Sequence, residues 1–163
     1  MKQKEINKDG LLICNLQAKI FENSIEKTQV SSEIFIRRFM NSKVAKLFDN
    51  GAILQSNIQE DDVFSMIEEQ YGKSSYGTVK YSSNEMYWIG YIYRYFCFTY
   101  DLTSTQVYKV IKPKQLRGLY FAYHTLDPAQ TIERIIEAND ISIFDKYDIK
   151  KQYELFKKIR GKQ

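Results

Sequence analysis

The stretch EMYWIGYIYRYFCFTY, residues Glu85–Tyr100, decides how the rest of the chain is interpreted. Eight of its sixteen residues are aromatic. Its large side chains recur at helical spacing on two adjacent faces, one with Trp88, Tyr91, Tyr95 and Phe98 and the next with Ile89, Ile92, Phe96 and Thr99. A helix that is apolar nearly all round is a buried helix at the centre of a domain. The stretch therefore predicts a central helix.

Residues at the start of this stretch favour a helix over a strand. Ser82-Ser83-Asn84-Glu85 fits a capping box, in which the Ser82 hydroxyl accepts from the backbone N–H of Glu85 and the Glu85 carboxylate reaches back. The alternation of tyrosine with Ile92 and Arg94 also fits a strand, and that alternative stays open. Gly90 costs about 1 kcal/mol inside a helix. We expect it to let a neighbouring helix approach closely.

Length and composition predict the fold class. The chain has 163 residues, which indicates one domain, and its two prolines and seven glycines are too few for the many turns of an all-β fold. Start and stop signals frame helices over 34–48, 104–111, 113–125 and 128–138, and a further helix that begins at Asp61 or Asp62 and ends at Tyr71. The sequence thus predicts an all-α fold, a compact single-domain bundle of several helices around the aromatic-rich central helix. The polar stretch 73–81 leaves room for one short strand pair.

Three segments are expected along the chain. Residues 1–10 are polar and predict a loose N-terminal tail, and residues 11–139 predict the helical domain. Residues 140–163 combine an apolar stripe with many lysines, which predicts a basic amphipathic helix packed on the domain or extending from it. The first residues lack a signal-peptide pattern, and the aromatic stretch is too short for a bilayer and carries Arg94 near its middle. We expect a cytoplasmic protein without a membrane partner.

Few residues in the chain suggest catalysis or metal binding. Cys14 and Cys97 have no metal or redox spacing, and we expect both to be reduced and buried. His124 is the only histidine, which makes a zinc site improbable. No phosphate-binding loop, dinucleotide fingerprint or nucleophile elbow occurs in the sequence. We therefore expect no cofactor and no metal, and a role other than catalysis is favoured.

One short pattern supports an enzymatic alternative. Arg117 is followed by six residues and then His124 (RGLYFAYH), and this spacing resembles that of helical HEPN-type ribonucleases. In such a pair the arginine stabilises the negative charge of the phosphorane and the histidine transfers a proton. Gly118 stands where that family usually has a polar residue.

A second alternative is DNA binding. Residues 86–98 and 103–111 are spaced like the two helices of a helix-turn-helix, although the turn lacks the typical glycine. This hypothesis implies promoter DNA as the partner. Its contact residues would be Thr103, Ser104, Gln106 and Lys109.

A protein-binding edge is the third and favoured hypothesis. A buried tyrosine hydroxyl without a partner costs on the order of 1–3 kcal/mol, so the five tyrosines of the central helix are not all expected to point inward. The segment Leu102–Leu126 is also basic and contains no acidic residue, which fits an acidic partner. Because aromatic side chains and arginine are enriched at protein interfaces, the predicted contact residues are Tyr87, Tyr93, Arg94, Lys112, Lys114 and Arg117.

A family resemblance points to the same class of function. The phrases YWIGYIYRY (residues 87–95) and YHTLDPAQ (residues 123–130) resemble a family of small bacterial proteins, and the likeness extends from Asn15 to Ala138. Some members are labelled antitoxins and lie beside genes for small toxin-like proteins, including an ADP-ribosyltransferase-like type. The resemblance implies that this chain neutralises a bacterial toxin by direct contact. It implies no particular site residues, and a homodimer remains an open alternative.

Overall fold

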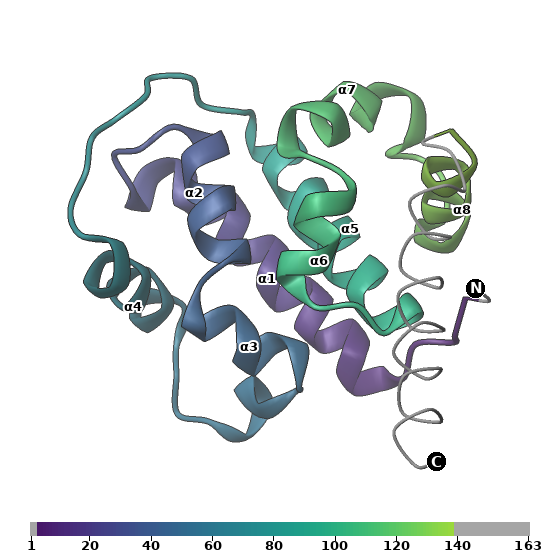
Figure 1. The fold of residues 1–163 in the computed structure, drawn as a ribbon, viewed down its shortest axis with the longest axis horizontal. Helices are drawn as coiled ribbons and strands as arrows, with labels where there is room; N and C mark the ends of the chain where they lie inside the picture. Colours follow the sequence, from purple (N-terminus) through teal and green to yellow (C-terminus); the bar gives the residue numbers. More distant parts are fainter. Residues whose placement is uncertain (1–2, 139–163) are drawn as a thin grey trace, which may run out of the picture.

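Two long helices form the centre of the molecule. Helix α1 (Lys8–Lys27) packs along α5 (Ser83–Tyr100), and the remaining helices surround this pair (Figure 1). The computed structural model describes residues 3–138 of the chain. Helix α5 is the aromatic stretch, so the prediction of a buried central helix is confirmed and the strand alternative is wrong. Its capping box is also present, since the Ser82 hydroxyl accepts from the Glu85 N–H at 3.2 Å and the Glu85 carboxylate from the Ser82 N–H at 3.0 Å.

The other helices lie on both sides of the central pair. In Figure 1, α2, α3 and α4 lie to the left, and α7 and α8 lie to the right. Among residues 3–138 the structure contains no strand, so the predicted all-α class is confirmed. The bounds are α2 (Ser32–Met40), α3 (Lys43–Asp49), the 3-10 helix η1 (Ala52–Gln55), α4 (Glu60–Tyr71), α6 (Ser104–Val110), α7 (Pro113–Tyr123) and α8 (Pro128–Ala138).

Gly90 sets the distance between the two central helices. A Cβ atom at this position would lie 2.9 Å from Cγ of Phe21 and 3.0 Å from both the Ala18 Cα and the Gln17 carbonyl oxygen. The side-chain amide of Gln17 in turn donates to the Gly90 carbonyl at 3.0 Å. The expectation that Gly90 permits a close approach is therefore confirmed, and backbone atoms of α1 occupy the space that a side chain would need.

Phenylalanine side chains from three helices fill the core beside α1. Phe21 meets Phe35 and Phe39 edge to face, with ring centroids 5.6 and 5.1 Å apart, and Phe39 meets Phe48 in the same way at 5.2 Å. These edge-to-face geometries place the positive rim of one ring against the negative face of another. They join α1, α2 and α3 into one core.

The predicted loose tail is wrong over part of its length. Helix α1 already begins at Lys8, because the Asn7 side chain accepts from the Gly10 N–H at 2.8 Å and caps it. The residues before it lie against the C-terminal end of α5: the Lys4 N–H donates to the Thr99 carbonyl at 2.8 Å, and the Lys4 ammonium group pairs with Asp101. The predicted helix of residues 140–163 falls outside the residues that the structure describes.

The segment after α4 supplies carbonyl groups to α2 instead of forming strands. The N–H groups of Ser31 and Ser32 donate to the carbonyls of Tyr76 and Val79 at 3.1 and 3.0 Å. The first N–H groups of a helix have no partner within the helix, so these bonds satisfy donors that would otherwise need water. The strand pair that the sequence allowed for is therefore absent from the described residues.

Residues Asn41 and Ser42 divide the helix that was expected over 34–48. The Ser42 hydroxyl accepts from the Ala45 N–H at 3.1 Å and starts α3, while the Asn41 side chain donates to the Arg37 carbonyl at 2.8 Å and closes α2. Short polar side chains compete with the helical hydrogen bonds of the backbone in this way. The prediction of one continuous helix is wrong at this point.

Both cysteines are free and buried, as predicted. Burial raises the pKa of the Cys14 and Cys97 thiols to about 12, so both stay protonated at neutral pH. Within residues 3–138, no helix is both long enough and apolar enough to cross a bilayer.

Candidate functional site

Two of the predicted contact residues, Tyr93 and Arg94, lie in the core. Both side chains have an exposed fraction of 0%, so the prediction that they contact a partner is wrong. Helix α5 is covered by α1, α6, α7 and α8 at once, and these two side chains find all of their polar partners inside the protein. They belong to the scaffold that supports a site and not to its surface.

Arg94 joins four helices through one guanidinium group. It donates to the Gln17 side-chain oxygen at 2.7 Å, to the Asp49 carboxylate at 2.6 Å and to the Ser104 hydroxyl at 2.6 Å. The same Asp49 oxygen accepts from the Ser104 hydroxyl at 2.6 Å and from its N–H at 3.0 Å. Charge, hydrogen bonds and geometry therefore compensate for the removal of this arginine from water.

Tyr93 is held by one hydrogen bond in the core. Its hydroxyl donates to the Ile111 carbonyl at 2.7 Å, and burial raises the pKa of this hydroxyl well above its usual range. The phenolate form is thus disfavoured in the folded protein. The Tyr91 hydroxyl follows the same trend, since burial raises its pKa to about 12.

We expect the protein to lose stability as the pH rises above about 10, where unfolded tyrosines ionise. Above that pH the unfolded chain releases protons that the folded chain retains, so the free energy of unfolding falls. The stabilisation is complete below the unfolded pKa and is lost as the pH approaches the higher folded pKa. Urea denaturation at about pH 8 and about pH 11 measures this difference. Tyr93→Phe should reduce it, and an unchanged pH dependence in that variant would contradict the assignment.

The predicted basic contact residues differ in their surroundings: two are exposed to solvent, and the third is engaged in contacts within the protein. Lys112 and Lys114 are exposed, and the Lys112 ammonium lies 4.1 Å from the centre of the Tyr108 ring. Arg117 donates to the Glu85 carboxylate at 3.0 Å and lies over the Tyr81 ring at 4.2 Å. The Arg117 side chain is thus engaged in joining α7 to the start of α5.

The two residues of the ribonuclease alternative have separate local partners. Arg117 points to Glu85, while His124 ends α7 with its Nδ1 atom 2.8 Å from the Tyr120 carbonyl. The His124 ring also stacks on the Tyr120 ring at 4.4 Å. Two turns of α7, about 10 Å of helix, separate the two positions. A shared role of this pair in RNA cleavage stays a prediction.

The residues of the DNA-binding alternative mostly serve the start of α6. The Thr103 side chain accepts from the Gln106 N–H at 3.2 Å, and the Gln106 side chain accepts from the Thr103 N–H at 2.9 Å. Ser104 has an exposed fraction of only 1%, so the expected contact of this residue with DNA is wrong. Lys109 is exposed. The first helix of the proposed motif is the central helix α5, which is covered on several sides.

An aromatic groove lies between α1, α5, α7 and the start of α8. It is an open cavity of about 580 Å³. Of the predicted contact residues, only Tyr87 lines it. Trp88 and Tyr120 in its lining meet edge to face, with ring centroids 5.7 Å apart. We call this cavity the aromatic groove; its lining residues are Glu22, Asn84, Tyr87, Trp88, Tyr91, Tyr120, His124, Leu126 and Pro128.

Carboxylates place negative charge at the aromatic groove. Glu22 is part of its wall, and the lining contains no lysine or arginine. Burial raises the pKa of Tyr87, and the negative charge of Glu22 raises it further. Burial likewise raises the pKa of Tyr95, with a smaller contribution from Asp127. The groove is therefore a largely apolar surface with negative charge at its edge.

Part of this groove was visible in the sequence. Tyr87, Tyr91 and Tyr95 are spaced four residues apart, which places them on one face of α5. Tyr91 and Tyr95 indeed stack, with ring centroids 6.2 Å apart. The contribution of Tyr120 and His124 depends on how α7 packs against α5, and no local pattern indicates that.

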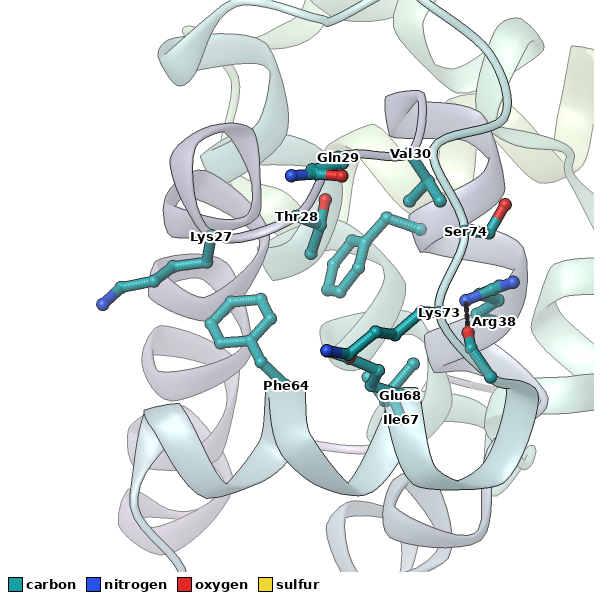
Figure 2. A pocket seen from close by; sticks show the side chains of 12 residues that line it. Lys27, Thr28, Gln29, Val30, Arg38, Phe64, Ile67, Glu68, Lys73 and Ser74 are labelled. Carbon is teal, nitrogen blue, oxygen red and sulfur yellow. Dashed lines mark hydrogen bonds and ion pairs between the residues drawn. The ribbon is translucent and has the colours of Figure 1, made fainter.

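A smaller pocket lies at the C-terminal end of α1, and Figure 2 shows it. Its volume is about 300 Å³, and Phe64 and Ile67 of α4 reach into it. The cations around it already have partners: Arg38 donates to the Gly72 carbonyl at 2.9 Å, and Lys73 lies 3.8 Å from Glu68. The Arg38 bond joins the end of α4 to α2, so we interpret the pocket as part of the scaffold.

The described part of the chain holds no group of three or more His, Cys, Asp or Glu side chains placed to bind a metal ion. In comparisons with known proteins, no protein-family model, no curated protein and no solved structure matches the chain significantly.

Proposed function

We propose that the protein is an antitoxin-like binding module that neutralises a bacterial toxin in the cytoplasm by direct protein–protein contact. The observation that carries this proposal is the aromatic groove. Tyrosine and tryptophan are enriched at the energetic centres of protein interfaces, because they combine a large apolar area with a polar group. The proposal also rests on the resemblance to antitoxin-labelled proteins, which suggests an ADP-ribosyltransferase-like toxin as one class of partner.

The rigidity of the groove supports a binding role. Its tyrosines stand on α5, which α1 fixes at close range through Gly90, and Tyr87 donates a hydrogen bond to the Asn15 side chain of α1. A preorganised surface loses less conformational entropy when a partner binds. The aromatic groove is therefore suited to bind a segment of another protein without first changing its own conformation.

The chemistry of the lining also favours binding over catalysis. The Tyr91 hydroxyl has a pKa raised to about 12 and stays protonated at neutral pH, where it acts as a hydrogen-bond donor. The two thiols are buried and protonated, so neither is an activated nucleophile. A neutralising protein needs only to occupy the surface of its partner.

Co-expression of this protein with the product of the gene next to its own tests this function. We expect that product to arrest growth, and the wild-type chain to restore growth and to co-purify with it. Tyr91→Ala should weaken binding by about 2 kcal/mol, roughly 30-fold, as expected for an aromatic residue at the centre of an interface. Calorimetric titration of the purified pair measures the loss.

Two control variants separate the groove from the rest of the surface. Tyr91→Phe keeps the ring and should bind nearly as well as the wild type. Phe121→Ala removes an aromatic ring that is 89% exposed on α7 and does not line the groove, so it should not alter binding. Equal losses in Tyr91→Ala and Phe121→Ala would contradict the proposal. Recovery of a promoter fragment or of cleaved RNA instead of a protein would favour one of the nucleic-acid alternatives.

A further inference from the structure

We infer that the aromatic groove takes a basic segment of its partner, with an arginine or lysine side chain seated against the tyrosine and tryptophan rings. This inference rests on the proposed function and specifies the chemistry of the partner at that same site. It reverses the expectation from the basic run of residues 102–126, which pointed to an acidic partner.

The charges around the groove favour a cation. Glu22 forms part of the wall, and Asp127 acts electrostatically on both Tyr91 and Tyr95. One Asp127 oxygen accepts from the Ala129 N–H at 2.8 Å, where it caps α8. An acidic segment would bring its carboxylates towards these two residues, and repulsion of like charges would oppose binding.

The end of α7 adds negative potential at the same place. Tyr120 and His124 occupy the last turn of this helix, and both line the groove. The last carbonyl groups of a helix carry a partial negative charge, which attracts cations. This helix end and the two carboxylates act in the same direction. The first turns of α5 and α8 also border the groove through Asn84 and Pro128, and their partial positive charge opposes it, so the full charge of Glu22 and Asp127 carries the preference.

The rings supply the second part of the recognition. Arginine and lysine bind over aromatic faces through the ring quadrupole, and a guanidinium group can stack on a ring while its edge pairs with a carboxylate. The protein already uses such contacts elsewhere, with Arg117 at 4.2 Å over Tyr81 and Lys112 at 4.1 Å from Tyr108. A groove with Tyr87, Trp88 and Tyr91 beside Glu22 offers the same pair of interactions to an external cation.

Trp88 makes this inference measurable, because it is the only tryptophan in the chain and it lines the groove. The probes are two synthetic peptides of equal length and apolar content, one with arginines and one with glutamates at the same positions. We expect the arginine peptide to change the Trp88 fluorescence in a saturable way and to bind at least tenfold more tightly than the glutamate peptide. Added salt should reduce this preference, since part of it is electrostatic.

A charge-neutral groove provides the decisive comparison. Glu22→Gln with Asp127→Asn removes both carboxylates, and asparagine still caps a helix well, so α8 should be preserved. We expect this double variant to lose about tenfold in affinity for the arginine peptide and to lose its preference between the peptides. Glu69→Gln with Glu137→Gln changes the net charge equally at exposed positions away from the groove and should behave as the wild type.

The outcomes separate this inference from the proposed function. Equal binding of the two peptides would contradict the inference that the groove takes a basic segment. A preference for the arginine peptide that is retained in the charge-neutral variant would also contradict it. If Tyr91→Ala abolishes binding of the adjacent gene product while the charge-neutral groove still binds it fully, the proposed function stands and this inference fails. If the arginine peptide binds as expected while the adjacent gene product does not bind, the antitoxin-like function fails and the cation preference stands.

Discussion

Arg94→Met should lower the free energy of unfolding by about 3–5 kcal/mol, the cost of removing one partner of a buried ion pair. Methionine fills part of the same space but leaves the Gln17 side-chain oxygen without the donor Arg94 and the Asp49 carboxylate without its counter-charge, with Ser104 still donating to it. Urea denaturation followed by circular dichroism measures the effect. Arg94→Lys keeps the charge, but an ammonium group cannot reproduce the three hydrogen bonds of the planar guanidinium. We therefore expect this variant also to have a lower free energy of unfolding, by a smaller amount.

An arginine on the surface provides the matched control for this experiment. Arg134 is exposed on α8, and Arg134→Met should change stability by no more than about 0.5 kcal/mol. Asp49→Asn completes a double-mutant cycle with Arg94→Met, and we expect a coupling energy of at least about 1 kcal/mol because the two groups are in contact. Equal stability of the Arg94→Met and Arg134→Met variants would show that the buried hydrogen bonds contribute little.

Gly90→Ala and Gly118→Ala should change stability in opposite directions, although both replace a helical glycine by alanine. At Gly90 the new methyl group would meet Phe21 and the backbone of α1 at 2.9–3.0 Å, so overpacking should cost about 1–3 kcal/mol. At Gly118 nothing lies within 4 Å, and the gain in helix propensity should stabilise the protein by about 1 kcal/mol. Denaturant midpoints of the two variants test this difference in sign. Two changes of the same sign would show that propensity, and not the α1–α5 contact, decides the outcome at Gly90.

The elements of the fold were largely predictable because their start signals are local. Ser82, Pro113 and Asp127 each mark the beginning of a helix through a hydrogen bond or a fixed backbone angle that depends on only a few neighbours. The division at Asn41 and Ser42 was missed because the apolar spacing continues across it. There the polar side chains and the core packing override the periodic pattern.

The site was predictable only in part, since burial depends on contacts that are distant in the sequence. Arg94 lies among tyrosines, which are common at protein surfaces. Inside the core, however, Gln17, Asp49 and Ser104 accept hydrogen bonds from its guanidinium group. Of the predicted contact residues, only Tyr87 lines the aromatic groove, whereas Tyr91 was assigned to a face of the buried helix. The pairing of Trp88 with Tyr120 joins two helices separated by a third, and nothing in the local pattern of either helix indicates it.

The arrangement around Arg94 has a consequence for synthesis of the protein on the ribosome. Its partners come from α1, α3 and α6, so a nascent chain that ends before Ser104 lacks one of the three hydrogen-bond acceptors of the arginine. We expect such incomplete chains to remain unfolded, and the core around Arg94 to form only after α6 has left the ribosome.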